Sequence, residues 1–432
     1  MREQYPRIHL SHRRFGAGCA GNVRDVSTAG LRQARLDAEV VIPVKWCGGP
    51  GEVYRIDEMG RYLAALRHAV RHVTVVDGSP AGERRRHEEA WGAYARILAP
   101  EAWPAAAARA TNGKVVGAVT GIRAARHELV VLADDDVRHT PDSLATMIRA
   151  LADADLVRPV NVYDAWPWQA RWDGARSLVN VAIATDWPGT FAVRRSTVLA
   201  CGGWSAEVLF ENLELWRTVQ ALGGRAVALD GVTVSRRAPT PSMFWSQRVR
   251  QAYDDLAQPQ RLVVELAILP ALGAVARARP RALALVLGAA VAVAHRGRCR
   301  VGTDRVPPSV PLWAPVWVLE RGVCVWIALG SRLKGGMRYG GRRFRVAAHS
   351  AGWLTRRLDP DGQRRRTGPY GRARQDGHAR TTHIPAPGES DPCPNPCMDL
   401  RPVGTEGPRP HRTHGRLEQV ARPVLRPRKE RR

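Results

Sequence analysis

Several features that would define a class of protein are scarce in this chain of 432 residues. The seven cysteines are scattered, with neither the paired spacing of a zinc site nor the density of a disulfide framework, which favours a reducing compartment. The first residues are basic and contain no apolar run, so we expect no secretory signal there. A simple spanning helix needs about 20 apolar residues, and every apolar run of nearly that length in this chain contains a charged residue.

Acidic residues are also scarce, with 40 Asp and Glu against 66 Lys and Arg, and the net charge is +26. The excess is uneven, because 24 basic and 9 acidic residues lie from Ser331 onward and give that quarter a charge of +15. The basic character therefore does not describe the N-terminal part of the chain. A non-enzymatic protein that binds nucleic acid or anionic membrane through its tail remains an alternative on charge alone.

Three consecutive carboxylates, Asp134, Asp135 and Asp136, follow the apolar run 129–133, which contains no cation. In an extended segment the outer two side chains point to the same side. Asp134 and Asp136 are therefore candidates to share one Mg²⁺ or Mn²⁺, cations that accept carboxylate and phosphate oxygens together. Asp135 would face away into a hydrogen bond. The alternative for this motif in isolation is an acidic turn before a helix at 141–151.

Strands and helices alternate between Glu39 and Leu229. Alternating apolar runs and amphipathic stretches of this length imply a mostly parallel sheet with helices on both faces. The polar residues of interest follow the strands, at the edge where open α/β sheets bind ligands. The expected strands are 40–44, 72–76 and 129–132, and the expected helices are 56–70, 83–97, 113–125 and 141–151.

Four motifs occur in the order and approximate spacing seen in family 2 glycosyltransferases of the GT-A fold. They are Ile42-Pro43, Val76-Asp77-Gly78-Ser79, Gly113-Lys114 with Gly121–Ala125, and Asp134–Asp136. The resemblance continues through Pro188–Thr190, Gly202–Trp204, Phe210–Leu215 and Gly223-Gly224, and Gln247–Arg250 resembles the Gln-x-x-Arg-Trp element of membrane-associated members. It extends over residues 39 to 255, about half of the chain.

This resemblance implies an α/β, Rossmann-like GT-A fold and a metal-dependent hexosyltransferase of cell-envelope glycan synthesis. The enzyme would move a sugar from a nucleotide-sugar donor to a hydroxyl acceptor with inversion. By the same resemblance, Pro43, Asp77, Lys114 and Asp134 would bind the nucleotide-sugar, and Asp134 with Asp136 would hold Mg²⁺ or Mn²⁺ on the diphosphate. The metal would neutralise the leaving nucleoside diphosphate.

The acceptor hydroxyl needs a base, and Glu211 and Glu214 are the candidates. Many relatives carry Asp where this chain has Asn212, and an amide cannot accept the proton. The alternative for both glutamates is that they stabilise the first turn of a helix at 211–222 through its dipole.

Gln247 and Arg250 are expected to contact phosphate or acceptor, although Gln251 stands where the motif usually ends in Trp. The alternative for Arg250 is a solvated helix face shared with Arg248. Asp77 has an alternative of its own as a turn former.

Three apolar stretches follow, at 262–276, 282–294 and 311–330. The first two are too short for a simple spanning helix, and the third contains Glu320 and Arg321, which need burial against protein or an interface. We expect these helices to associate with the cytoplasmic face of the cell membrane, with a soluble helical cap as the alternative. The basic element 335–343 resembles one that faces anionic phosphates in lipid-acting relatives, so the resemblance implies either a lipid-linked acceptor or another hydroxyl acceptor.

The predicted organisation has four parts: a poorly specified segment 1–38, a GT-A domain 39–257, a membrane-associated helical region 258–335 and a basic, largely disordered tail 336–432. The tail has few large apolar residues and no periodicity, so it cannot bury enough surface to offset ordering entropy. A nucleotidyltransferase with a similar metal site remains an alternative within enzymes. We expect no specific nucleic acid partner, because such binding leaves the strand-end carboxylates unexplained.

Overall fold

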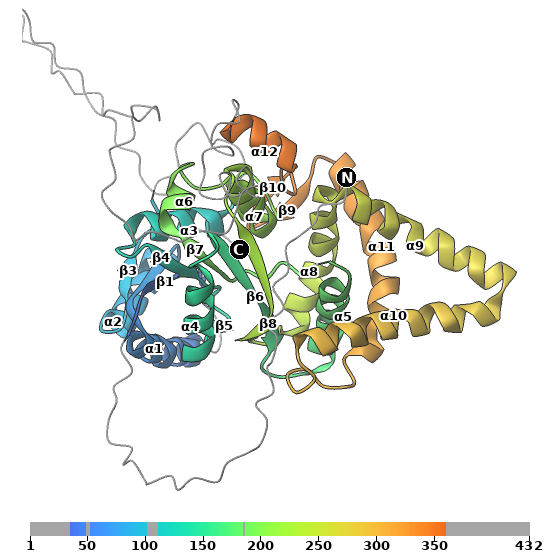
Figure 1. The fold of residues 1–432 in the computed structure, drawn as a ribbon, viewed down its shortest axis with the longest axis horizontal. Helices are drawn as coiled ribbons and strands as arrows, with labels where there is room; N and C mark the ends of the chain where they lie inside the picture. Colours follow the sequence, from blue (N-terminus) through green and yellow to red (C-terminus); the bar gives the residue numbers. More distant parts are fainter. Residues whose placement is uncertain (1–34, 49–51, 102–110, 185, 360–432) are drawn as a thin grey trace, which may run out of the picture. The chain divides into compact units, whose positions relative to one another are not determined.

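The computed structural model describes residues 35–48, 52–101, 111–184 and 186–359, and the predicted initial segment and most of the predicted tail lie outside these ranges. Its core contains an eight-stranded sheet with the order β3-β2-β1-β4-β7-β6-β8-β5 (Figure 1). The strands are β1 (Leu36–Val44), β2 (Val70–Asp77), β3 (Arg96–Leu98), β4 (Leu129–Leu132), β5 (Val137–Arg138), β6 (Leu156–Tyr163), β7 (Phe191–Arg194) and β8 (Ala226–Arg236).

The first half of the sheet is parallel. Strands β3, β2, β1 and β4 pair in parallel, and β6 pairs in parallel with β8. Strand β7 runs antiparallel between β4 and β6, and β5 pairs antiparallel with β8 at the edge. The predicted α/β class with a mostly parallel sheet is confirmed.

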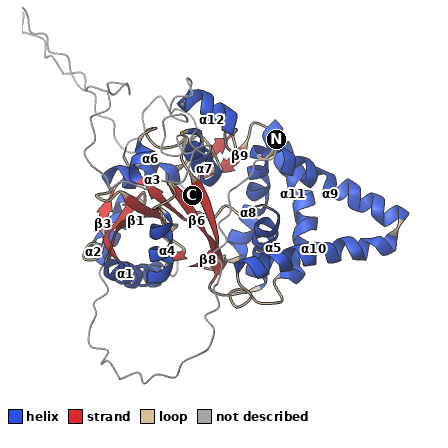
Figure 2. Cartoon of the chain, viewed as in Figure 1, coloured by secondary structure: helices blue, strands red, loops and turns tan. Residues whose placement is uncertain are grey.

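Helices cover both faces of this sheet, as shown in Figure 2. Alternate residues of β1 divide between two apolar clusters, because Val40 and Ile42 join Met59 on one face while Val41 joins Ile122 on the other. The helices of this part are α1 (Glu52–Ala69), α2 (Ala81–Trp91), α3 (Gly113–Ala124), α4 (Pro141–Ala150), α5 (Trp168–Ile183), α6 (Arg195–Leu199), α7 (Glu211–Ala221) and α8 (Pro241–Asp254).

Two predicted helix ends differ from the structure. Val70 opens β2 instead of closing the preceding helix, and the helix expected to reach Ile97 ends at Trp91. Ile97 pairs with Val75 in the edge strand β3. Strand pairing with β2 satisfies the backbone of this short segment, and helical periodicity alone could not reveal that partner.

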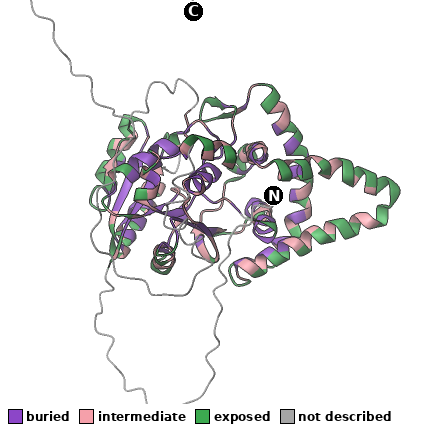
Figure 3. Ribbon diagram, turned by 45° about the horizontal axis from the view of Figure 1, so that its top comes forward, coloured by how far each residue is buried: buried purple, intermediate pink, exposed green. Residues whose placement is uncertain are grey.

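The apolar stretches form three long helices, α9 (Pro259–Ala278), α10 (Pro280–Val301) and α11 (Ala314–Leu333), with short 3₁₀ turns η1 (Asp255–Ala257) and η2 (Pro311–Trp313) before α9 and α11. Helix α10 packs on α5, and α11 packs on α8 and α9. Among the described residues, Glu265 is the buried residue of α9, and most of α10 is exposed or half-buried (Figure 3).

Two stretches, Pro280–Val301 and Pro311–Leu333, have the length and composition to cross a membrane. The first is longer than its apolar run predicted, because the helix continues through Arg296, Arg298 and Arg300. Length and composition of this kind also occur in core helices of soluble proteins, and the apolar window of the second stretch is 39% buried.

The described residues after α11, up to Asp359, form regular structure, although the prediction assigned everything from residue 336 to the tail. They form the hairpin strands β9 (Met337–Tyr339) and β10 (Arg342–Phe344) and the helix α12 (Ala351–Leu358). Phe344 is buried in a cluster with Leu209 and Tyr253, and backbone bonds join 209–210 to 346–347. This short segment is stabilised by a core that the preceding domain supplies, which composition alone could not show.

Candidate active site

A cavity of about 780 Å³ lies at the ends of the strands β1, β2 and β4. One group of lining residues comes from these strand ends and from the start of α3. A second group comes from α5, α7, α8, α9, α11 and the β9–β10 hairpin. The cavity brings together the predicted residues Pro43, Lys114, Asp134, Asp136, Glu211, Gln247 and Arg250, whereas Asp77 and Glu214 are not part of its lining.

Lys114 links the strand end to the helix α7. Its Nζ lies 2.6 Å from Asp134 Oδ1 and 3.0 Å from Glu211 Oε1. The Asn112 side chain caps α3 by accepting a hydrogen bond from the Lys114 backbone N–H at 3.1 Å, which fixes where the lysine leaves the helix. Burial works against the ammonium charge, but Asp134 and Glu211 raise the pKa of Lys114 above its ordinary value. The lysine therefore stays a cation inside the cavity.

Glu211 is a weak candidate for a base in this arrangement. Burial acts to raise its pKa, but Lys114 and Arg250 hold the pKa of Glu211 below the ordinary value. An ion-paired carboxylate of this kind binds a proton poorly near neutral pH. Asn212 donates a hydrogen bond to the Trp187 carbonyl at 3.3 Å and offers no alternative base.

The three strand-end carboxylates have different partners. Asp135 Oδ2 accepts a hydrogen bond from Trp46 Nε1 at 2.5 Å, so the hydrogen bond expected for this residue is present. The extended segment expected for the three aspartates is not, because β4 ends at Leu132 and residues 135 and 136 form a turn, and Asp135 lines the cavity together with its neighbours. Asp136 Oδ2 lies 2.8 Å from Arg236 Nε, and its Oδ1 is buried without a hydrogen-bond partner. The absence of cations within the run is thus compensated by Arg236 of β8 and Lys114 of α3, which the sequence pattern did not reveal.

Asp134 and Asp136 are the carboxylates of the cavity that could hold a divalent cation. No cluster of three or more His, Cys, Asp or Glu side chains that could hold a metal occurs among the described residues. Two carboxylates are nevertheless enough for Mg²⁺ or Mn²⁺ when phosphate oxygens complete the coordination shell. The unpartnered Oδ1 of Asp136 is the atom that such a cation would satisfy.

Gly189 leaves room for this group. A Cβ at position 189 would lie 1.9 Å from Asp134 Oδ2 and 2.6 Å from Lys114 Nζ. Any other residue would push apart the lysine and the carboxylate. The Pro188-Gly189-Thr190 motif therefore needs glycine at its centre, because only glycine leaves space for the pair of Asp134 and Lys114.

Asp77 and Glu214 make contacts that hold the fold together. Asp77 is buried, and its two oxygens accept hydrogen bonds from the Ser79 backbone at 2.8 Å and from His87 Nδ1 at 2.7 Å. Glu214 is also buried and lies 2.8 Å from the His349 backbone nitrogen and 2.7 Å from its Nδ1. Asp77 thus organises the turn after β2, and Glu214 attaches the segment before α12 to α7.

Gln247 and Arg250 lie on the face of α8 that lines the cavity. The Arg250 guanidinium stacks over the Tyr339 ring at 5.1 Å, which joins α8 to the β9–β10 hairpin. Tyr339 and Arg342 of this hairpin also line the cavity, so the basic element after the long helices contributes to the site. Arg248 lies on the other face and pairs with Asp173, 2.7 Å away.

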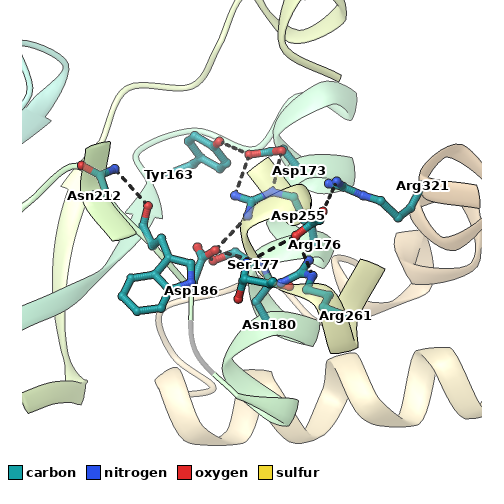
Figure 4. A network of polar contacts seen from close by, with 12 residues as sticks. Tyr163, Asp173, Arg176, Ser177, Asn180, Asp186, Asn212, Asp255, Arg261 and Arg321 are labelled. Carbon is teal, nitrogen blue, oxygen red and sulfur yellow. Dashed lines mark hydrogen bonds and ion pairs between the residues drawn. The ribbon is translucent and has the colours of Figure 1, made fainter. Parts of the chain in front are cut away.

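A network of buried and half-buried ion pairs connects the cavity wall to the helices α9 and α11 (Figure 4). Arg176 of α5 pairs with Asp173 and Asp186, at 3.0 and 2.8 Å. Asp255 of η1 pairs with Arg261 of α9 and Arg321 of α11, at 2.9 and 2.7 Å. The charged residues within the apolar stretches of the sequence already indicated that each needs an oppositely charged partner. Arg321 is buried against protein, as the sequence required for a charge within an apolar stretch. Glu320 lies 3.6 Å from Arg248, and Arg321 pairs with Asp255.

Residues 104–163 match the model of glycosyl transferase family 21. The match contains Lys114 and the three strand-end aspartates, and it confirms the predicted class, a glycosyltransferase. None of the curated proteins matches the chain.

Among solved structures, the mannosyltransferase PcManGT from Pyrobaculum calidifontis, in complex with GDP-Man and Mn²⁺, is 17% identical with a TM-score of 0.38, and the alignment covers 79% of this chain and 85% of that one. Glucosyl-3-phosphoglycerate synthase from Mycobacterium tuberculosis, in complex with Mn²⁺, UDP and phosphoglyceric acid, is 17% identical with a TM-score of 0.31, covering 48% of this chain and 72% of that one.

Proposed function

We propose that the chain is a metal-dependent glycosyltransferase that moves a sugar from a nucleotide-sugar donor to a hydroxyl acceptor with inversion. The observation that carries this proposal is the cavity in which Lys114, Asp134 and Asp136 meet at the strand ends, within the segment that matches a glycosyltransferase family. Pairs of carboxylates beside a lysine suit a donor whose diphosphate carries negative charge.

Different residues of the chain would bind different parts of this donor. Asp134 and Asp136 would hold Mg²⁺ or Mn²⁺, which supplies charge neutralisation for the leaving diphosphate. Lys114 places a second positive charge beside Asp134, 2.6 Å away. Pro43 and Gly78 line the cavity next to this group and would border the nucleotide. Asp77 contributes indirectly, through the turn that positions Gly78.

We further propose that the acceptor is lipid-linked and that the long helices bind the cytoplasmic face of the membrane. Large apolar side chains are exposed along α9, α10 and α11, including Val263, Val264, Leu285, Val323 and Trp326. Exposed apolar surface of this extent marks a binding surface, and the basic residues near the helix ends would favour anionic lipid. Arg261 and Arg321 line the same cavity as Lys114, so these helices contribute directly to the wall of the site.

A donor screen tests the function. The purified chain is incubated with a panel of nucleotide-sugars, including UDP-glucose and GDP-mannose, with Mn²⁺ or with EDTA, and release of nucleoside diphosphate is measured. We expect metal-dependent hydrolysis of one donor in the absence of acceptor. Release of pyrophosphate from a nucleoside triphosphate and sugar phosphate would instead identify a nucleotidyltransferase. No turnover and no binding of any nucleotide-sugar would refute the proposal.

A further inference from the structure

One carboxyl group at the cavity has no role in the mechanism described so far. Asp254 is the last residue of α8 and lines the cavity. Its side chain is partly buried, and its Oδ1 is buried without a hydrogen-bond partner. A buried oxygen without a partner destabilises the fold, because it has lost its hydrogen bonds to water. Such an atom at the wall of a substrate cavity points to a partner that arrives with the substrate.

The other carboxylates of the lining already have partners. Asp186 accepts three hydrogen bonds from α5, and Asp255 pairs with two arginines. Glu211 is paired with Lys114, and the run 134–136 belongs to the donor end. Among the described lining residues, this leaves one carboxylate that makes no hydrogen bond or ion pair.

The charged groups around Asp254 come from four elements. Arg250 lies one turn earlier on the same helix, Glu211 on α7, Asp255 on η1 and Arg321 on α11. Burial raises the pKa of Asp254 to about 8; the two arginines oppose this shift, and the two acids add to it. With this pKa the group is mostly protonated at neutral pH, and the carboxylate that forms as the pH rises takes up a proton more readily than the ion-paired Glu211.

We propose that Asp254 is the general base of the transfer, a role that rests on the proposed glycosyltransferase function. Its carboxylate takes the proton of the acceptor hydroxyl while the acceptor oxygen bonds to the anomeric carbon. The bond from that carbon to the diphosphate oxygen breaks, and its electron pair leaves with the nucleoside diphosphate. Asp254 thereby supplies, from another element, the carboxylate that the amide of Asn212 cannot provide.

Substitution of Asp254 tests the role. UDP-glucose or GDP-mannose, whichever the wild-type chain hydrolyses, serves as the probe with Mn²⁺ and water as the acceptor. Asp254→Asn should lower kcat by roughly 10² to 10⁴-fold, with donor KM unchanged within about twofold. The rise of wild-type activity with pH, centred near pH 8, should disappear in this variant. Asp153→Asn, at an exposed position, is the matched control and should keep wild-type kinetics.

Sodium azide separates a base from a structural residue, because the azide anion attacks without losing a proton. Azide should restore donor consumption by Asp254→Asn and yield a glycosyl azide. Turnover of Asp254→Asn close to that of the wild type, or a loss of turnover that azide does not restore, would overturn the role of Asp254 while the glycosyltransferase function stands. A wild-type chain that consumes no nucleotide-sugar would overturn both.

Discussion

Asp136→Asn is the substitution that separates the metal site most sharply from the fold. Asp136 Oδ1 is unpartnered, whereas Oδ2 pairs with Arg236 at 2.8 Å. Loss of a charged metal ligand should remove about 3 to 4 kcal/mol of transition-state stabilisation, a fall in kcat/KM on the order of 10² to 10³-fold. The ion pair with Arg236 contributes far less to folding, about 1 kcal/mol, because the two side chains are 25% and 29% exposed and asparagine keeps an acceptor oxygen.

The assay for Asp136→Asn is a titration of nucleotide-sugar binding with and without Mn²⁺, with a thermal melt of each protein. We expect the effect of Mn²⁺ on affinity to vanish in the variant and the melting temperature to fall by only a few degrees. Asp153→Asn is the matched control, because it makes the same change at an exposed position that does not line the cavity. Equal dependence on Mn²⁺ in Asp136→Asn and the wild type would show that Asp136 is not a metal ligand.

Three further outcomes are expected. A chain that ends at Asp359 should have the melting temperature and the activity of the full chain. A chain that ends before β9 should lose the stabilisation from burial of Phe344, about 1.5 to 3 kcal/mol. An unchanged melting temperature of this shorter chain would show that Phe344 does not stabilise the fold. Burial opposes ionisation of Asp186, but Arg176 and the hydrogen bonds from Ser177 and Asn180 lower the pKa of Asp186 to about 2. The ionised Asp186 therefore stabilises the fold above pH 4, and this stabilisation is lost as the pH falls towards 2. In melts between pH 4 and pH 2, the melting temperature of Asp186→Asn should fall less than that of the wild type. The wild type should pellet with anionic vesicles, and high salt should weaken this binding without abolishing it. The double variant Val264→Ser/Leu285→Ser should lower the fraction of protein that still pellets at high salt. Equal pelleting of the variant and the wild type would show that charge alone causes the binding.

The placement of two of the long helices bears on the surroundings of the proposed base. Arg261 and Arg321 line the cavity and pair with Asp255 at the end of α8, close in sequence to Asp254. Helices α9 and α11 therefore contribute side chains to the same part of the cavity wall as Asp254, the carboxylate proposed as base.

Much of the framework was predictable from local patterns. The helix α3 begins after its Asn112 cap, and the strand β4 ends before the three aspartates, as turn chemistry and apolar periodicity indicated. These features depend on residues a few positions apart, so the sequence contains all the information that determines them.

The partners of the polar residues were decided by tertiary structure. Glu214 and His349 are 135 positions apart, and Asp136 and Arg236 are 100 apart. No periodicity within the chain encodes such meetings, yet they determine which carboxylate is neutralised, which supports the fold and which stays free in the cavity. The sequence by itself therefore determined the parallel strands and the acidic edge, because these follow from local backbone preferences. Only the packing of α7, α8 and the segment before α12 decided the electrostatic state of each carboxylate, since charge interactions depend on distance in space and on burial.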